Sequence, residues 1–245
     1  MSQIPHFGIE SFIDSKEFFS YPESSLQLQE TKSENKLDNA KNTDNIDSSS
    51  DYLVTFSGQS IDFCVGLVDI INSTKIAAGM TMENTTRLYQ IFLNSMSKVL
   101  TRFGGSVIKN VGDSLLYYFP DTSKEKRKFG FMSCIECNLT MIEARDIICR
   151  QLEKEGLPRI DYRISLDYGS LMIMRDTLSG TLDFLGPPLN ICSKINHSAP
   201  RNGIVIGGDL YQMVKSLDDY CFKPTQGYSA GLRYSYPVYS VTRKD

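Results

Sequence analysis

The sequence predicts an α+β fold in which a mixed, mainly antiparallel sheet is covered by helices. Two long segments carry apolar residues at three and four residue steps, as on one face of a helix. Short runs of β-branched and aromatic residues lie between and after these segments, and tight turns separate several of them. Strands joined by hairpins as well as by helical crossovers are typical of α+β domains.

The predicted domain begins with a strand that turns into a helix. Residues 61–70 form an apolar run that ends in a carboxylate, and the small polar residues 72–74 are natural N-caps for a following helix. Helical periodicity then continues through residues 88–103. Gly104 and Gly105 end this helix.

A hairpin and a second long helix follow. Residues 106–110 and 114–119 flank a tight Val-Gly-Asp turn, which predicts two antiparallel strands. Residues 124–154 repeat apolar side chains on one face and predict a single helix. Gly156 and Pro158 end it.

The second half of the domain alternates strands and short helices. Prolines open one of these helices, at the position where a missing N–H group costs least. Strands are predicted at 160–169, 171–175, 181–186, 203–208, 220–224 and 236–241, and helices at 187–199 and through Tyr211 and Val214.

The N-terminal fifth of the chain has a different composition. Residues 1–26 are rich in aromatic side chains, whereas residues 27–51 hold six acidic side chains, three lysines and few apolar residues. We therefore expect a short N-terminal segment, a flexible acidic linker and one principal domain over residues 52–245. Because the linker accounts for the net charge of −3, the domain has no basic footprint for nucleic acid.

Composition and local patterns also exclude a membrane span and a secreted protein. The longest apolar run, around residues 63–71, is interrupted and far shorter than the roughly 20 residues that a spanning helix needs. The N-terminus lacks the basic and apolar regions of a secretory signal, so we expect a cytoplasmic protein. The six cysteines are then expected to be reduced core residues, and the Cys134-x-x-Cys137 pair has neither a second pair nor nearby histidines for zinc.

Two carboxylates are placed where a metal ion would bind. Asp69 ends the first apolar strand, and Asp113 lies in the hairpin turn. Taken singly, each is more typical of a turn or cap residue. As a pair on neighbouring strands they are plausible ligands for Mg²⁺, which prefers oxygen donors.

The residues after Asp69 are candidates for phosphate binding. Ile70, Asn72, Ser73 and Thr74 would present backbone N–H groups and hydroxyls at a helix start, where the helix dipole favours an anion. This signal is weak when it stands alone.

The ordered motifs resemble the catalytic domain of class III adenylyl and guanylyl cyclases. The resemblance covers residues 57–242, and it implies the nucleotide cyclase, ferredoxin-like arrangement of the α+β fold. The motifs are VDIINST (68–74), GGSVIKNVGDSLLYYF (104–119), LDYGSLMI (166–173), LDFLGPPLNICSKI (182–195) and GIVIGGDLYQMV (203–214).

The resemblance implies a role for each matching residue. Asp69 and Asp113 match the two metal ligands, and Lys109 and Asp183 match the pair that reads the purine base. Lysine and aspartate at these positions favour adenine, so ATP is the implied substrate. Asn190 matches the residue that orients the ribose.

The chain departs from the family pattern at three places. Lys194 stands where the family has an arginine that stabilises the transition-state phosphate, which removes a bidentate contact. Pro187 and Pro188 replace a small polar pair ahead of the ribose residue. Near the C-terminus, Arg233 is the candidate for a lysine that contacts the distal phosphates.

The implied reaction is conversion of ATP to 3′,5′-cyclic AMP and pyrophosphate with two Mg²⁺ or Mn²⁺ ions per site. Because the family shares its active sites across a dimer and this chain carries both halves of the site, a homodimer is implied, with a heterodimer as the alternative. A cyclase-like domain that binds nucleotide or a partner without turnover is the alternative function, favoured by Lys194 and the paired prolines.

Overall fold

The computed structural model describes residues 54–123, 127–176, 182–225 and 235–244. The predicted N-terminal segment and linker, residues 1–51, lie outside these ranges. The strands are β1 (Val54–Ile70), β2 (Ser106–Val111), β3 (Ser114–Phe119), β4 (Tyr162–Asp176), β5 (Leu182–Leu185), β6 (Ile204–Gly207), β7 (Tyr220–Pro224) and β8 (Val238–Arg243). The helices are α2 (Ser73–Ala78), α3 (Met82–Arg102), α4 (Arg127–Glu143), α5 (Arg145–Lys154), α6 (Pro187–Ile195) and α7 (Gly208–Val214), with 3-10 turns η2 (Pro120–Ser123) and η3 (Asn196–Ser198).

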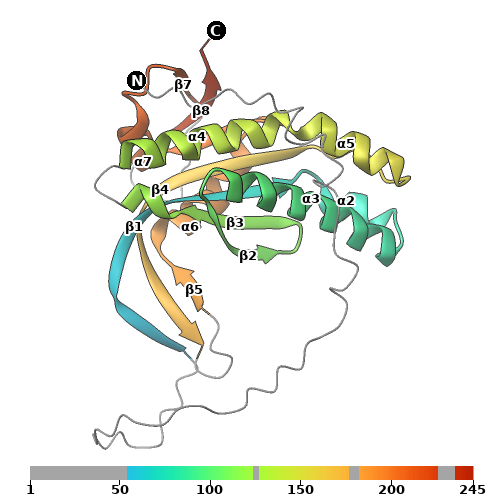
Figure 1. Cartoon of the computed structure of the whole chain (residues 1–245), viewed down its shortest axis with the longest axis horizontal. Helices are drawn as coiled ribbons and strands as arrows, with labels where there is room; N and C mark the ends of the chain where they lie inside the picture. Colours follow the sequence, from blue (N-terminus) through green and yellow to red (C-terminus); the bar gives the residue numbers. More distant parts are fainter. Residues whose placement is uncertain (1–53, 124–126, 177–181, 226–234, 245) are drawn as a thin grey trace, which may run out of the picture.

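The strands form one eight-stranded sheet in the order β2-β3-β1-β4-β6-β8-β7, with β5 paired to β4. Neighbouring strands run antiparallel except for β4 and β6, which are parallel. This arrangement confirms the predicted mixed, mainly antiparallel sheet. Figure 1 shows β1 and β4 as long strands whose ends project beyond the helices, with β5 beside them.

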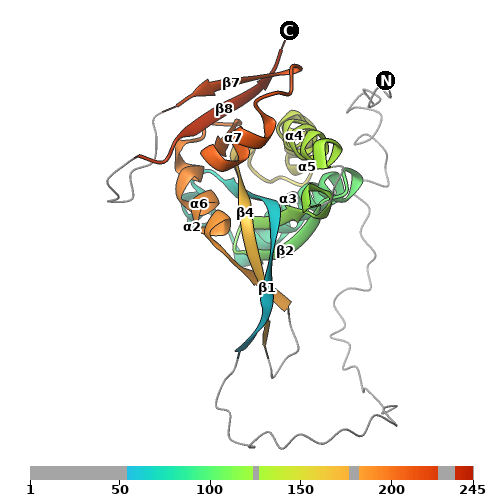
Figure 2. The same cartoon turned by 90° about the vertical axis from the view of Figure 1, so that its left-hand side faces the viewer.

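Helices cover both faces of this sheet. In Figure 2 the helices α3, α4 and α5 lie on one side of β1 and β4, and α6 lies on the other side. Alternation along β1 explains the two layers, since successive side chains of a strand point to opposite faces. Cys64 and Val68 join the large core under α3, α4 and α5, whereas Phe63, Val65 and Leu67 join the smaller core that includes Cys192 of α6.

The close approach of β1 and Tyr117 requires a glycine. A Cβ atom at Gly66 would lie 2.4 Å from the Tyr117 ring, so any side chain there would displace the ring. Tyr117 is fully buried, and its hydroxyl donates a hydrogen bond to the Asn138 side chain of α4. Gly66 therefore lets one aromatic side chain connect the sheet to the helical layer.

The helix predicted over residues 124–154 is divided into α4 and α5. The division lies at Ala144, where the N–H of Ile147 donates to the Ala144 carbonyl only three residues earlier. Arg145, the first residue of α5, also hydrogen-bonds through its Nε to the Ile160 carbonyl and pairs with Asp161. These tertiary contacts accompany the interruption, which the apolar periodicity does not mark.

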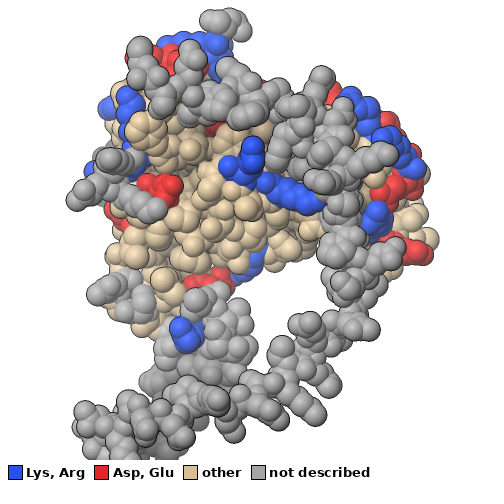
Figure 3. Space-filling view, in the orientation of Figure 1, with Lys and Arg blue, Asp and Glu red and all other residues tan. Residues whose placement is uncertain are grey.

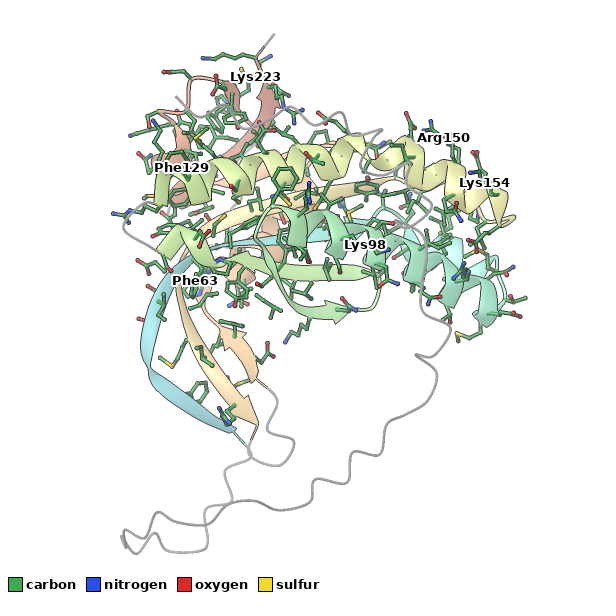
Figure 4. The ribbon with its side chains drawn as sticks, in the orientation of Figure 1. Phe63, Lys98, Phe129, Arg150, Lys154 and Lys223 are labelled. Carbon is green, nitrogen blue, oxygen red and sulfur yellow. The ribbon has the colours of Figure 1, made fainter. Side chains whose placement is uncertain are left out.

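The two strands predicted at 160–169 and 171–175 are one continuous strand, β4. Its partner β1 is also long, 17 residues against 15 in β4, with Gly169 opposite Phe63 and Ser170 opposite Asp62. Pairing on both sides of the Gly-Ser step keeps the two halves in one strand. Figure 4 marks Phe63 where the projecting ends of β1 and β4 meet the body of the molecule.

The cysteines lie mostly in the core, as expected, and the described helices can be compared with the length that a membrane span needs. All six cysteines are free, and all except Cys221 are buried, including Cys134 and Cys137 inside α4. Among residues 54–123, 127–176, 182–225 and 235–244, no helix combines the length and apolarity that crossing a membrane needs.

Charged side chains of both signs intermingle on the surface. In Figure 3 blue and red side chains lie next to one another at the right-hand end of the molecule, around α5. Arg145 and Arg159 both pair with Asp146 there, and Arg159 also pairs with Glu153. Exposed pairs of this kind contribute little to stability, about 0 to 1 kcal/mol each.

Candidate functional site

Sheet pairing brings Asp69 and Asp113 together. β3 runs antiparallel to β1 with Val68 opposite Leu115, so the hairpin turn that precedes β3 lies beside the end of β1. Gly112 closes that turn with a φ of +63°, a conformation that glycine adopts without strain. Ser114, the next residue after Asp113, donates a hydrogen bond from its Oγ to Asp69 Oδ1 at 2.6 Å.

The Asp113 carboxyl has an unusual environment. Burial raises its pKa above the ordinary value, and the charge of Asp69 adds to the rise, while hydrogen bonds from Ser73 and from backbone groups at Asp113 and Ile70 oppose it. Its Oδ2 atom is buried and has no hydrogen-bond partner among the described residues. A buried acceptor without a partner typically costs about 1 to 3 kcal/mol, so a ligand with positive charge would be favoured there.

The segment after β1 is only partly arranged as predicted. Asn72 occupies the N-cap position of α2, but its φ of 59° is left-handed and its side chain makes no capping hydrogen bond. Asn72 thus lies at the predicted cap position but does not cap the helix through its side chain, because its left-handed backbone belongs to a tight turn between strand and helix. Ile70 and Ser73 face Asp113, whereas Asn72 and Thr74 are exposed.

Arg163 is a site residue that the sequence patterns missed. It lies on β4 directly opposite Asp69, and its Nη2 is 3.6 Å from Asp69 Oδ2. Its Nε is buried and has no hydrogen-bond partner within the described ranges. The sequence does carry one signal for it: the arginine lies between two core residues of a strand, Tyr162 and Ile164. Successive side chains of a strand point to opposite faces, so this arginine points away from the core and contacts either solvent or a specific anion.

Tyr89 of α3 also borders this cluster without having been predicted. Burial raises the pKa of its hydroxyl, the Asp113 charge adds to that rise, and a hydrogen bond with Ser73 opposes it. The sequence did not predict that Tyr89 lies near Asp113, because the apolar periodicity of α3, which includes the neighbouring buried Leu88, places Tyr89 at the edge of the core.

A second cluster joins Lys109 and Asp183, which are 74 residues apart in sequence. Lys109 lies on β2 and Asp183 on β5, and the two side chains form an ion pair. The backbone N–H of Phe184 also donates to Asp183 Oδ1 at 2.8 Å, which orients the carboxylate. The structure thus brings together the two residues that the resemblance assigns to the base.

The remaining predicted residues lie on or beyond α6. Asn190 and Lys194 are exposed and one turn apart on this helix. Pro187 and Pro188 occupy its first turn, as predicted, and Pro188 is buried. Arg233 lies outside the described residues, so its predicted contact has no structural description.

The chemistry of the first cluster fits a divalent cation. Two carboxylates and two hydroxyls supply oxygen atoms, which are the donors that Mg²⁺ and Mn²⁺ prefer. The unpartnered Oδ2 of Asp113 leaves one carboxylate oxygen available for such an ion. The guanidinium of Arg163 adds a fixed positive charge beside the carboxylates, which suits an anionic ligand that arrives with the metal.

The chain is similar to nucleotide cyclases in sequence. A family model for the adenylate and guanylate cyclase catalytic domain matches residues 57–231. A cytidylate cyclase of Staphylococcus aureus is 24% identical over 152 residues, which are 60% of this chain and 36% of the relative. An adenylate cyclase of Streptomyces coelicolor is 22% identical over 142 residues, which are 58% of this chain and 31% of the relative. The chain spans about a third of the length of the curated relatives that it matches.

Solved structures share the fold. The adenylyl cyclase CyaB from P. aeruginosa superimposes with a TM-score of 0.68 at 20% identity, covering 76% of this chain and 96% of that one. The guanylate cyclase domain of RhGC from Catenaria anguillulae, determined with GTP, gives a TM-score of 0.66 at 18% identity and covers 77% of this chain and 100% of that one. With the family model matching most of the chain, this protein belongs to the adenylate and guanylate cyclase catalytic domain family.

Proposed function

We propose that this nucleotide cyclase domain converts ATP into 3′,5′-cyclic AMP and pyrophosphate. One observation carries the proposal: Asp69 and Asp113 meet at the end of β1, and Asp113 keeps a buried carboxylate oxygen without a partner among the described residues. A domain that only bound a protein partner would gain nothing from this arrangement, which costs stability.

The proposed reaction is an intramolecular phosphoryl transfer. The 3′-hydroxyl attacks the α-phosphorus, a new oxygen–phosphorus bond forms, and pyrophosphate leaves. Asp69 and Asp113 would hold two divalent cations, Mg²⁺ or Mn²⁺, which lower the pKa of the attacking hydroxyl and neutralise the triphosphate when they are bound. The protein contributes position and fixed charge, with Arg163 as the cation beside the phosphates.

The Lys109 and Asp183 pair supports adenine as the base. A lysine donates hydrogen bonds and a carboxylate accepts them, so the pair matches the ring acceptor and the exocyclic amine of adenine. Curated relatives are named cytidylate and adenylate cyclases, and guanylyl cyclases are among the similar structures. The assay must therefore compare ATP with GTP and CTP.

Asn190 and Lys194 are proposed to act on the ribose and on the transition-state phosphate. Lys194 supplies one point charge, whereas an arginine would supply two parallel donors, so we expect slow turnover. This substitution supports a second candidate function, in which the domain binds nucleotide and regulates a partner without turnover. A Lys194→Arg variant separates the two, because an enzyme limited at this position gains activity and a purely regulatory domain does not.

We further propose a homodimer with two equivalent sites. Lys109 and Asp183 pair within one chain, which supports their acting together as the base-reading half of a site. The metal half, Asp69 and Asp113, would then serve nucleotide held by the second copy. Sedimentation equilibrium with and without nucleotide measures this association.

The function is tested with purified protein and each nucleotide in turn, with Mg²⁺ or Mn²⁺, and cyclic products are identified by mass spectrometry. Cyclic AMP that disappears in Asp69→Ala supports the proposal. Lys223→Ala is the matched control, because Lys223 lies on β7 at the opposite edge of the sheet from β2 (Figure 4). Folded, dimeric protein that makes no cyclic nucleotide would contradict the proposal.

A further inference from the structure

His197 contacts the arginine of the metal cluster. The Arg163 Nη2 atom lies 2.9 Å from His197 Nδ1, while the same Nη2 is 3.6 Å from Asp69 Oδ2. The histidine is thus a close polar neighbour of this guanidinium, and the guanidinium still has a buried Nε without a partner among the described residues.

The chemistry of arginine fixes the direction of this hydrogen bond. A guanidinium stays charged in proteins and only donates, so His197 Nδ1 must be the acceptor. A histidine that accepts at Nδ1 is neutral and carries its proton on Nε2. The contact therefore specifies one tautomer of a side chain that is otherwise exposed.

The backbone that carries His197 is anchored to the sheet. His197 is in the 3-10 turn η3, next to the buried Asn196, whose Nδ2 lies 3.2 Å from Ser165 Oγ on β4 and 3.4 Å from the Leu67 carbonyl on β1. Ser198 Oγ donates to the Ile195 carbonyl at 2.6 Å and closes the turn. These bonds place the imidazole relative to the same two strands that carry Asp69 and Arg163.

We propose that His197 is a positioning residue for Arg163, which it holds at the metal cluster so that the guanidinium can bind a phosphate oxygen of the nucleotide or of pyrophosphate. This inference rests on the proposed function for its ligand. Without the histidine, the guanidinium retains, among the described residues, its longer contact with Asp69, a carboxylate that the proposed cation also needs. The arginine would then bind phosphate less often in the productive orientation.

The first test measures pyrophosphate binding by titration calorimetry in the presence of Mg²⁺. His197→Leu should weaken binding about 5- to 20-fold, as expected for loss of one charge-assisted contact. His197→Asn should recover most of that loss, because its amide oxygen replaces Nδ1 as acceptor. His6→Ala, which removes the other histidine of the chain, should change nothing.

A double-mutant cycle separates positioning from general damage. In an Arg163→Lys background, His197→Leu should cause no further loss, because the group that it positions is gone. With ATP, His197→Leu should raise KM more than it lowers kcat. An equal loss in both backgrounds, or binding by His197→Leu equal to that of the original chain, would overturn the proposal.

A spectroscopic test needs neither metal nor turnover. The chain has two histidines, so ¹⁵N spectra of the metal-free protein can be assigned with the His6→Ala variant. His197 should show an unprotonated Nδ1 in the original chain and a changed signal in Arg163→Lys; a protonated Nδ1 would contradict the inference. If the protein binds pyrophosphate but makes no cyclic nucleotide, the proposed function fails while this cycle still decides the role of His197.

Discussion

Asp113, which is half-buried, and Asp167, which is fully buried, both have a buried carboxylate oxygen, but their surroundings lead to opposite roles. Burial raises the pKa of both carboxyls, and that of Asp167 rises to about 7. Asp167 on β4 is 1% exposed, and its oxygens accept hydrogen bonds from the Tyr236 hydroxyl at 2.9 and 3.1 Å and from the Leu210 N–H at 3.4 Å. Asp113 instead leaves its buried Oδ2 without a partner among the described residues.

The difference teaches that burial alone does not identify a functional acid. A satisfied carboxyl joins elements of the fold: Tyr236 also accepts a hydrogen bond from the Asp209 N–H, so the segment before β8 is tied to α7 and β4. In Asp113, one buried oxygen lacks a partner among the described residues and a second acid lies nearby, so the folded protein carries an unfavourable free energy that a ligand can remove. We therefore expect Asp113 to matter for binding and Asp167 to matter for stability.

Among the effects on ligand binding, the largest is expected for the metal ion. Asp69→Asn and Asp113→Asn should each weaken Mn²⁺ binding by about 100-fold or more, since each removes an anionic oxygen ligand. The measurement is Mn²⁺ titration by electron paramagnetic resonance with 3′-deoxy-ATP, which lacks the attacking hydroxyl. Asp167→Asn should bind Mn²⁺ with an affinity within a few-fold of that of the original chain. Equal losses of affinity in all three variants would contradict the distinction between Asp113 and Asp167.

Asp183 is a third aspartate to compare, because its carboxylate is partly exposed and is paired with Lys109. Asp183→Ala and Lys109→Ala should each lower kcat/KM for ATP about 10- to 100-fold and narrow the preference for ATP over GTP and CTP. Their effects should not add, because the residues contact one another. Competition assays with mixed nucleotides measure the preference, and an unchanged preference would remove these residues from base recognition.

Asp167 should give folding stability a distinctive pH dependence. Because its pKa is higher in the folded state than in the unfolded state, the folded protein binds more protons between about pH 4 and 7. This carboxyl therefore makes the free energy of unfolding fall as pH rises, by up to about 1.4 kcal/mol per pH unit across that window. The change levels off about one pH unit above the folded-state pKa of about 7.

Denaturant unfolding from pH 5 to pH 8 measures this slope. Asp167→Asn carries no titrating group, so its stability relative to the original chain should increase across that range. Four other titratable groups interact with Asp167: Tyr236, Asp209, Cys64 and Cys192. Burial is the main cause that raises the pKa of the two thiols and of the tyrosine, so none of these three groups ionises between pH 5 and pH 8. A constant difference between the two proteins would contradict the prediction.

The smallest expected effect is that of Tyr236→Phe. The substitution leaves the Asp167 oxygens with fewer donors and should lower the free energy of unfolding by about 1 to 3 kcal/mol, with little change in Mn²⁺ affinity. Thermal unfolding measures the first quantity. If Tyr236→Phe lost Mn²⁺ affinity and kept its stability, the roles assigned to Asp113 in binding and to Asp167 in stability would be wrong.

Much of the fold was predictable because local signals agree with the final structure. The apolar run in residues 61–70, the glycine turn before Asp113 and the prolines that open α6 each specify their element directly. The division at Ala144 and the continuity of β4 were not predictable, since they depend on the contacts of Arg145 and on pairing with the long β1.

The candidate site was predictable only where a motif marks it. Asp69, Asp113, Lys109 and Asp183 follow from the ordered motifs, and the fold brings each pair together. Arg163 was marked only by its place between two buried strand residues, and His197 has no local signal, because their proximity depends on register across β1 and β4 and on the anchored turn η3. The distinction between Asp113 and Asp167 likewise required the hydrogen bonds of the folded chain.

The most direct test compares cyclic AMP formation by the original chain, Asp113→Asn and Asp167→Asn under identical conditions, with folding of each verified by circular dichroism. We predict product from the original chain, a loss of about 1,000-fold or more in Asp113→Asn, and activity within a few-fold in Asp167→Asn. Asp113→Asn as active as the original chain would contradict the account.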